Sequence, residues 1–261
     1  MHRLSAAKRR REGLKAALRR LIPTWGKYAE ILLYPSFCEI CKTFLEKPGE
    51  KVICQSCWAK MRAEAPPSHC LCCGRFFEAA AESHLCLNCL ERTPPYSKHR
   101  SCSRYDGIIK EIIHLYKYRG FEVLGQYLGD FAGETLSEEE DLWLGVDAII
   151  PVPLHPARER KRGFNQAQVL AQRLSKIRNI RLLEKRLVKV KNISPQTSLK
   201  AEARARNVRG AFKVKKPEEI KGKIVLLVDD VYTTGSTLRE CSLVLMKAGA
   251  KEVRAVTVAQ A

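Results

Sequence analysis

The hydrophobic residues of the C-terminal part of the chain fall into uninterrupted runs, which are separated by longer amphipathic stretches. Three runs, DAIIPVP, KIVLLVDD and EVRAVTVA, begin at residues 147, 223 and 252. Such continuous apolar strands are typical of a parallel sheet that is covered on both faces. The first two are followed by the helix-like stretches NQAQVLAQRLSKI and STLRECSLVLMKAGA. Residues 99–261 are therefore predicted to form an α/β domain, with a parallel sheet flanked by helices.

Two of these strands lead into candidate binding loops. One loop follows Pro153 and the other follows Asp230. In open parallel sheets, ligands bind beyond the carboxyl ends of the strands. We therefore expect the functional site at these two loops.

Two further zones precede this domain. Residues 1–33 form a basic extension in which leucines recur at helical spacing. The extension is either a short amphipathic helix that docks on the protein body or an electrostatic arm for nucleic acid or a membrane surface. Residues 34–98 are rich in cysteine, and the segment ERTPPYSKHRS at residues 91–101 is predicted to be a linker into the α/β domain.

The cysteine zone contains four CxxC pairs, and successive pairs begin 16 residues apart. Two cysteines separated by two residues can hold a metal ion from a tight turn, and two such turns complete a tetrahedral thiolate site that suits Zn(II). We predict two sites formed by pairs in chain order, with a cross-braced arrangement as the alternative. The predicted ligands are Cys38, Cys41, Cys54 and Cys57 in one site and Cys70, Cys73, Cys86 and Cys89 in the other.

The pattern favours zinc over other uses of paired cysteines. A disulfide framework does not suit a cytosolic chain, and a redox CxxC normally occurs singly beside a βαβ unit. Closed sets of four thiolates indicate structural sites, because a catalytic zinc keeps an open position. Zinc would stabilise a segment too short to build its own core, so a strong chelator should unfold residues 34–98 and spare the α/β domain. Outside the pairs, Cys241 is predicted to pack in the core with Leu238 and Leu245.

Composition and charge narrow the class of protein and of partner. A hydrophobic content of 45% is enough for a folded core. No apolar run approaches the ~20 residues that span a bilayer, and the basic N-terminus lacks the apolar stretch of a signal peptide, so we expect a cytoplasmic protein. The net charge of +19 lies mostly in residues 1–20 and 155–215. A positive field of this size favours polyanions: nucleic acid, anionic lipid or phosphorylated small molecules.

The loop after Asp230 combines features of a phosphate site and of a sugar site. The segment Thr233, Thr234, Gly235, Ser236 and Thr237 is predicted to lie at a helix N-terminus that starts near Ser236, where free N–H groups and the helix dipole attract anions. Asp229 and Asp230 repel phosphate, but carboxylates accept hydrogen bonds from vicinal sugar hydroxyls. A ribose 5-phosphate satisfies both halves of the motif. The chain has neither GxxxxGK[ST] nor GxGxxG, so a P-loop or dinucleotide site is not supported.

These motifs together resemble known families. VLLVDDVYTTGST resembles the phosphoribosyl-pyrophosphate (PRPP) motif of type I phosphoribosyltransferases. PVPLHPARERKRGFNQAQVLA, PQTSLKAEARARNVRGAF and the preceding cysteine ladder resemble the ComF family, which includes bacterial competence proteins and GntX-like proteins. The resemblance covers roughly residues 34–261. It implies a type I phosphoribosyltransferase fold preceded by a double zinc ribbon.

The resemblance also assigns roles to individual residues. Asp229 and Asp230 would hold the ribose hydroxyls, and the segment from Thr233 to Thr237 would hold the 5-phosphate. The loop from Pro153 to Gly163 would hold pyrophosphate, with Arg162 and Gly163 at its core. A mobile hood from Gln196 to Asn207 would close over the site. Further pyrophosphate contacts are expected from Arg204 and Arg206, Mg(II) would bridge the pyrophosphate, and Lys117 and Arg119 match a family motif of unclear role.

One departure from the pattern leaves the reaction open. Purine phosphoribosyltransferases often carry an aspartate that assists the base at the place of Thr233, and a threonine cannot take up a proton. The family context implies a role in natural transformation, with single-stranded DNA and competence-machinery proteins as partners. One alternative is a metabolic phosphoribosyltransferase with an unknown small acceptor. The other is a regulator that senses PRPP and does not catalyse its turnover.

Overall fold

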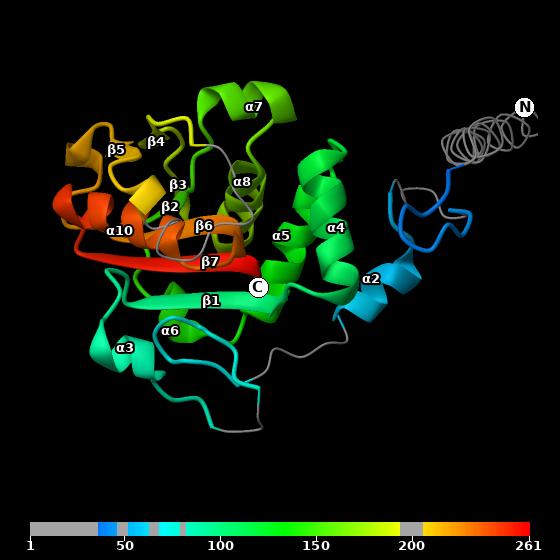
Figure 1. The fold of residues 1–261 in the computed structure, drawn as a ribbon, viewed down its shortest axis with the longest axis horizontal. Helices are drawn as coiled ribbons and strands as arrows, with labels where there is room; N and C mark the ends of the chain where they lie inside the picture. The colour runs from blue at the N-terminus through cyan, green and yellow to red at the C-terminus, as the bar shows by residue number, and fades with distance from the viewer. Residues whose placement is uncertain (1–35, 46–51, 63–67, 79–81, 194–205) are drawn as a thin grey trace, which may run out of the picture. The chain divides into compact units, whose positions relative to one another are not determined.

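The computed structural model describes residues 36–45, 52–62, 68–78, 82–193 and 206–261 (Figure 1). The chain divides into two compact units, residues 1–60 and residues 61–261. The predicted basic extension lies outside the described residues. No helix among the described residues has both the length and the apolar character needed to cross a bilayer.

The second unit is built on a five-stranded sheet, and all of its strand pairs are parallel. The strand order is β1-β7-β6-β2-β3. This confirms the predicted parallel sheet, because the three apolar runs of the sequence form β2, β6 and β7. The strands are β1 (Lys98–Arg104), β2 (Ala148–Pro151), β3 (Arg181–Leu182), β6 (Ile224–Tyr232) and β7 (Glu252–Gln260).

The connections make β2 and β6 the switch point of the sheet. These two strands are neighbours, with Pro151 opposite Val228. From β2 the chain continues through α8 (Gln166–Arg178) to β3 at one edge, whereas from β6 it continues through α10 (Ser236–Lys247) to β7 on the other side. Loops that diverge in this way open a crevice at the carboxyl ends of the two strands. Both candidate loops of the sequence start there.

Helices cover both faces of this sheet (Figure 1). On one face α5 (Leu124–Thr135) packs against α8, and α4 (Gly107–Tyr118) packs against α5. On the other face Val225 and Leu227 of β6 share an apolar core with the α10 side chains Leu238, Cys241 and Leu245. The predicted core role of Cys241 is confirmed. Shorter elements complete this unit: α3 (Leu87–Glu91), α6 (Glu140–Trp143), α7 (Pro156–Arg162), η1 (Pro217–Glu219) and the antiparallel hairpin of β4 (Leu187–Lys189) and β5 (Phe212–Val214).

The two cysteine-rich turns are structural repeats of each other. In the first unit, before α2 (Gln55–Arg62), the Cys38 N–H donates to Thr43 O at 2.8 Å and the Lys42 N–H donates to Cys38 O at 2.9 Å. The same two bonds recur 32 residues later in the second unit. There the Cys70 N–H donates to Arg75 O at 2.8 Å, and the Gly74 N–H donates to Cys70 O at 2.9 Å. Lys42 and Gly74 both adopt a positive φ, of 61° and 64°. The first CxxC pair of each cluster, Cys38/Cys41 and Cys70/Cys73, therefore lies in a tight turn that reverses the chain.

Strand β1 corrects the prediction of a linker at residues 91–101. Its sequence KHRSCSR is polar, yet five of its seven residues are buried. The Arg100 guanidinium donates to Glu139 at 2.9 Å, and the His99 ring contacts Cys73 O at 2.8 Å and Thr257 Oγ1 at 3.0 Å. Partners from distant parts of the chain thus satisfy the polar groups, and a local pattern of hydrophobicity cannot reveal such partners.

Candidate functional site

The two aspartates at the end of β6 point to opposite faces of the sheet. Successive side chains alternate along a strand, so Asp229 continues the Leu227 face, which is covered by α10, and Asp230 continues the Val228 face. Asp230 is only 8% exposed, whereas Asp229 is half-buried. A charged side chain near a strand end is expected to remain accessible to solvent, but the structure buries Asp230.

Asp230 is held by a lysine from the helical layer. Lys117 of α4 lies with its Nζ 2.8 Å from the Asp230 carboxylate, and the two side chains are 15% and 11% exposed. Burial alone lowers the pKa of a lysine, but the attraction of Asp230 outweighs it and raises the pKa of Lys117. Lys117 therefore keeps its charge beside the Asp230 carboxylate. No role for Lys117 could be derived from the sequence, because only the fold brings α4 to the end of β6.

The negative charge of Asp229 is balanced less well than that of Asp230. The backbone N–H of Asp230 donates to its carboxylate at 2.9 Å. Burial, followed by repulsion from Asp230, raises the pKa of Asp229 from 3.8 to about 7. Among the residues that the structure describes, Asp230 therefore forms an ion pair with Lys117, whereas Asp229 forms none. A bound cation would lower the pKa of Asp229 again.

One cavity of about 130 Å³ gathers several of the predicted site residues. Asp229, Asp230, Arg162 and Thr237 line it together, as predicted from the two loops. Two lysines that the sequence did not assign to the site, Lys117 and Lys189, line it too. The remaining lining residues are Val152, Pro153, Leu154, Asn165, Gln166 and Ala167. Two carboxylates and three cationic side chains thus face one small space, which suits a ligand with both hydroxyl and phosphate groups.

The loop between β6 and α10 has the geometry of an anion site. Helix α10 begins at Ser236, as predicted, and Gly235 precedes it with a φ of 72°. A Cβ at Gly235 would lie 2.4 Å from the Tyr232 hydroxyl, so the residue must be glycine for steric as well as conformational reasons. The hydroxyls of Thr234 and Ser236 lie 2.9 Å apart. The N-terminal N–H groups of α10 are left available for a ligand.

The predicted pyrophosphate loop is mostly helical. Residues Pro156 to Arg162 form α7, which ends at Gly163 with a φ of 88°. The Arg162 guanidinium donates to Gln166 Oε1 at 3.0 Å and stands over the Tyr118 ring at 5.4 Å. A proline at the first helical turn and basic residues in the last turn favour this helix locally. Arg162 is thereby fixed at the cavity, while Gly163 does not line it.

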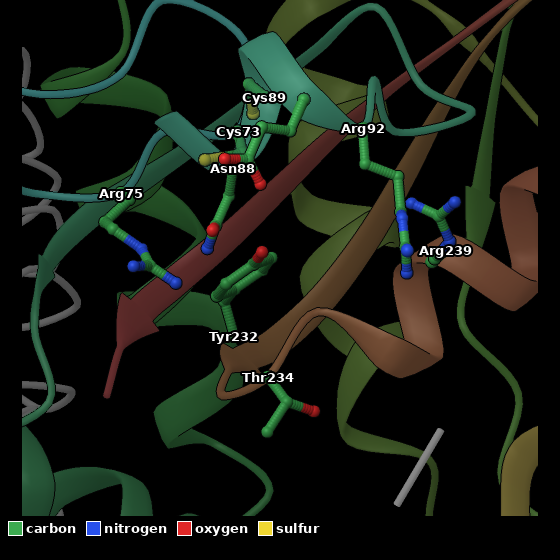
Figure 2. A pocket seen from close by; sticks show the side chains of 9 residues that line it. Cys73, Arg75, Asn88, Cys89, Arg92, Tyr232, Thr234 and Arg239 are labelled. Carbon is green, nitrogen blue, oxygen red and sulfur yellow. The ribbon is translucent and has the colours of Figure 1, made fainter. Parts of the chain in front are cut away.

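The other predicted contacts lie elsewhere. Arg204 lies outside the described residues, as does most of the predicted hood. Arg206 is exposed and does not line the 130 Å³ cavity. Thr233 and Thr234 line two further cavities, of about 220 and 500 Å³, which share Arg75 and Tyr232 (Figure 2). The segment from Thr233 to Thr237 therefore faces more than one cavity.

The second cysteine cluster is connected to the same loop through two stacked rings. The His99 ring contacts Cys73 O and stacks on Tyr232, with centroids 4.5 Å apart. Tyr232 in turn contacts the Tyr96 hydroxyl at 3.5 Å and lies against Gly235. Gly74 allows the close approach, because a Cβ there would lie 2.4 Å from His99 O. The cysteine turn thus supports the end of β6.

The eight predicted metal ligands form two clusters. In each cluster the four sulfur atoms lie within 4.8 Å of one another. The pairs combine in chain order, with Cys41 Sγ 3.6 Å from Cys54 Sγ in the first cluster and Cys73 Sγ 3.7 Å from Cys86 Sγ in the second. Four sulfur ligands without a carboxylate or histidine fit a closed Zn(II) site. Burial raises the pKa of Cys73 to about 12, so its thiolate form requires a cation.

Two family models match the chain. Residues 31–90 match the family model of the double zinc ribbon domain, and residues 145–261 match that of the phosphoribosyl transferase domain. A purine phosphoribosyltransferase from Pyrococcus horikoshii Ot3 is 23% identical over 51% of this chain and 73% of that chain, with a TM-score of 0.33. A TM-score of this size supports no inference.

Several curated relatives match parts of the chain. Competence protein F of Haemophilus influenzae is 42% identical over 116 residues, which are 44% of this chain and 51% of the relative, so the match spans about half its length. DNA utilization protein YhgH of Escherichia coli O6:H1 is 32% identical over 63% of this chain and 73% of the relative. Competence protein ComFC of Streptococcus pneumoniae is 31% identical over 60% and 65%. With a double zinc ribbon, a phosphoribosyltransferase domain and these relatives, the chain belongs to the ComF family.

Proposed function

We propose that this protein binds PRPP with Mg(II) at the cavity of Asp229 and Asp230 and acts in the cytoplasmic handling of single-stranded DNA during natural transformation. The observation that carries the PRPP part is the charge arrangement of this cavity. Two carboxylates end a buried strand, and Lys117, Lys189 and Arg162 face the same space. In a pentose phosphate, the hydroxyl groups can donate hydrogen bonds to the carboxylates, and the phosphate groups can bind the cationic side chains.

The two carboxylates would have different tasks. Asp230 is held in place by Lys117, so it can accept a hydrogen bond from one ribose hydroxyl without moving. Asp229 can accept from the neighbouring hydroxyl when it is ionised, and its raised pKa means that a cation must assist this at neutral pH. A cavity of about 130 Å³ has room for a pentose but not for the whole of PRPP. The phosphates would extend from it over the adjoining loops.

The residues fit a magnesium ion at this site. Mg(II) prefers oxygen ligands and is held in proteins by one or two carboxylates together with substrate phosphates. Asp229 offers such an oxygen and lacks a close cationic partner. Bound Mg(II) would neutralise charge on the pyrophosphate leaving group. Lys189 and Arg162 would hold the same group from the protein side, and the N–H groups at the start of α10 would hold the 5-phosphate.

The DNA part of the proposal is supported by the relatives and by the charge. The relatives include proteins named for competence and for DNA utilization. A net charge of +19 attracts the phosphate backbone of nucleic acid. Thr233 lines the neighbouring cavity of about 220 Å³ and provides no acid or base for an acceptor group.

Calorimetry with PRPP and Mg(II) tests the site. We expect Asp229→Asn to abolish Mg(II)-dependent PRPP binding in a folded protein. Asp230→Asn alone would leave Lys117 buried without a partner and destabilise the fold, so the matched variant is Lys117→Met with Asp230→Asn, which removes both charges. This double variant should also lose PRPP binding. Unchanged PRPP affinity in folded Asp229→Asn would exclude the assigned site.

Turnover separates the three functional alternatives. PRPP consumption is measured with and without single-stranded DNA. Stimulation by DNA supports the proposed function, steady turnover with a small acceptor alone favours a metabolic transferase, and tight binding without turnover favours a PRPP-sensing regulator.

A further inference from the structure

A second, larger cavity lies beside the second cysteine cluster and is lined by arginines (Figure 2). We call it the arginine cavity. Its volume is about 500 Å³, which is within the range of small-molecule sites. Its lining residues are Cys73, Arg75, Asn88, Cys89, Glu91, Arg92, Tyr232, Thr234 and Arg239. It shares no lining residue with the cavity of Asp229 and Asp230.

The three arginines come from separate elements and lack acidic partners. Arg75 belongs to the second cysteine turn, Arg92 follows α3, and Arg239 lies in the first turns of α10. In the described part of the chain none of them forms an ion pair. Glu91 is the one acidic residue among those that line this cavity. Figure 2 shows Arg92 and Arg239 on one side of the cavity and Arg75 on the other. Like charges around one cavity repel one another, and a bound anion relieves this repulsion.

The cationic surface continues into a neighbouring cavity. That cavity has a volume of about 220 Å³ and shares Arg75 and Tyr232 with the arginine cavity. It adds Arg104, whose guanidinium donates to Phe77 O at 2.8 Å and stands 5.7 Å from the Phe76 ring centroid. Arg104 is thus fixed with its charge at the cavity wall. Four arginines along two adjoining cavities suit an extended polyanion better than a single phosphate.

We propose that the arginine cavity and its neighbour bind the phosphodiester backbone of a single-stranded nucleic acid. The inference rests on the DNA part of the proposed function and places the strand beside the PRPP cavity, with the loop of Thr233 and Thr234 between the two. Guanidinium groups hold phosphate oxygens through paired hydrogen bonds, which fix the position of a strand and not its sequence. The Asn88 amide and the exposed Thr234 hydroxyl offer further polar contacts.

The arginines could instead balance the zinc site. A zinc ion with four thiolates carries a charge of about −2, and Cys73 and Cys89 line the cavity. The two accounts differ in what is lost when arginines are removed. Charge balance predicts loss of zinc, whereas a strand site predicts loss of nucleic-acid binding with zinc retained.

The test compares two charge-matched double variants of the full chain. Arg92→Ala with Arg239→Ala alters the cavity, and Lys247→Ala with Lys251→Ala removes the same charge from exposed positions that do not line it. Binding of a fluorescent oligo-dT is followed by anisotropy at several salt concentrations. We expect the arginine variant to bind the oligo-dT at least about tenfold more weakly than the wild type. The slope of log affinity against log salt concentration should become shallower by about 1.4, because each of the two lost phosphate contacts contributes about 0.7. The control should change little.

Zinc content and PRPP binding are measured on the same samples. The proposal is overturned if the two variants bind the strand equally, or if the arginine variant loses zinc but still binds the strand. Inorganic pyrophosphate and AMP serve as competitors. If they bind through Arg92 and Arg239 while the wild type binds no strand, the cavity is a small-anion site and the assigned ligand is wrong. Loss of PRPP binding in Asp229→Asn with normal strand binding would show that the two sites are separate.

Discussion

Asp229 is the residue whose ionisation decides how the cavity behaves near neutral pH. Desolvation of the carboxyl group, followed by repulsion from the neighbouring Asp230, raises its pKa to about 7. In the unfolded chain the same carboxyl group loses its proton near its ordinary value of 3.8. Between these two values the native state therefore binds a proton that the unfolded state has released. The native state consequently loses stability relative to the unfolded state as the pH rises through this window.

This difference gives a prediction for stability. The free energy of unfolding of the wild type should fall as the pH rises from about 4 to about 7 and then level off. Asp229→Asn lacks the titrating group, so its stability relative to the wild type should increase over that window, by up to about 4 kcal/mol. Urea titrations at several pH values measure this. A constant difference between the two proteins would contradict the raised pKa.

The same carboxyl group predicts the pH dependence of ligand binding. If ionised Asp229 binds the ribose or the metal ion, PRPP affinity in the presence of Mg(II) should increase as the pH rises from 6 to about 8. Calorimetry across this range checks the expectation, with corrections for the ionisation of the buffer. An affinity that is independent of pH would place the ligand away from Asp229.

Gly235 allows a prediction with a matched control. Gly235→Ala introduces a Cβ at a φ of 72°, and that atom would lie 2.4 Å from the Tyr232 hydroxyl. Gly222 has nearly the same φ, of 73°, and no atom within 4 Å of the added Cβ. Both variants should lose about 1 kcal/mol from the backbone conformation. Gly235→Ala should lose more, and it should also weaken PRPP binding. Equal losses, measured by thermal unfolding, would mean that Tyr232 moves aside freely.

At the scale of elements, the second cysteine turn is part of the core of the α/β sheet. Cys70, Cys73 and Cys89 share one apolar cluster with Val253 and Ala255 of β7. Phe76 N–H donates to the Gln260 side chain at 2.9 Å, so the turn also bonds to the end of β7. This changes the expectation that a chelator would unfold residues 34–98 and spare the rest. Loss of the second zinc should weaken the sheet as well.

Single cysteine variants separate the two clusters. Cys41→Ser and Cys73→Ser should each reduce the zinc content from two ions to one, because each cluster then lacks a ligand. Only Cys73→Ser should lower the melting temperature of the phosphoribosyltransferase domain substantially, since Cys73 is buried in its core. Metal analysis and calorimetric scans provide the two readouts. An unchanged domain transition in Cys73→Ser would show that the cluster contributes little to the sheet.

For the whole molecule, the excess of positive charge predicts salt-dependent binding of DNA. Each phosphate that a protein neutralises contributes about −0.7 to the slope of log affinity against log salt for single strands, so even four contacts give a slope near −3. Truncation of residues 1–33 tests the basic extension separately. We expect binding to survive, because the family resemblance starts after this segment. No measurable binding of single strands at low salt would favour the metabolic transferase.

The sequence alone determined those features whose cause is local. Uninterrupted apolar runs predicted the parallel strands β2, β6 and β7, and cysteine spacing predicted both clusters and their pairing in chain order. The start of α10 at Ser236 followed from the small polar loop before it. Each of these rests on periodicity, on spacing or on turn chemistry within a few residues. A resemblance carried by several motifs supplied the family.

The tertiary structure alone decided which distant groups meet. The polar strand β1 forms because Glu139 and Thr257 satisfy Arg100 and His99, and no local pattern encodes those partners. Lys117 reaches Asp230 only because α4 packs near the end of β6. Burial and the energies of ion pairs depend on what the rest of the chain places around a group. The sequence could therefore indicate which residues form the site, but not the charge state of Asp229 or the arginines gathered beside the zinc ribbon.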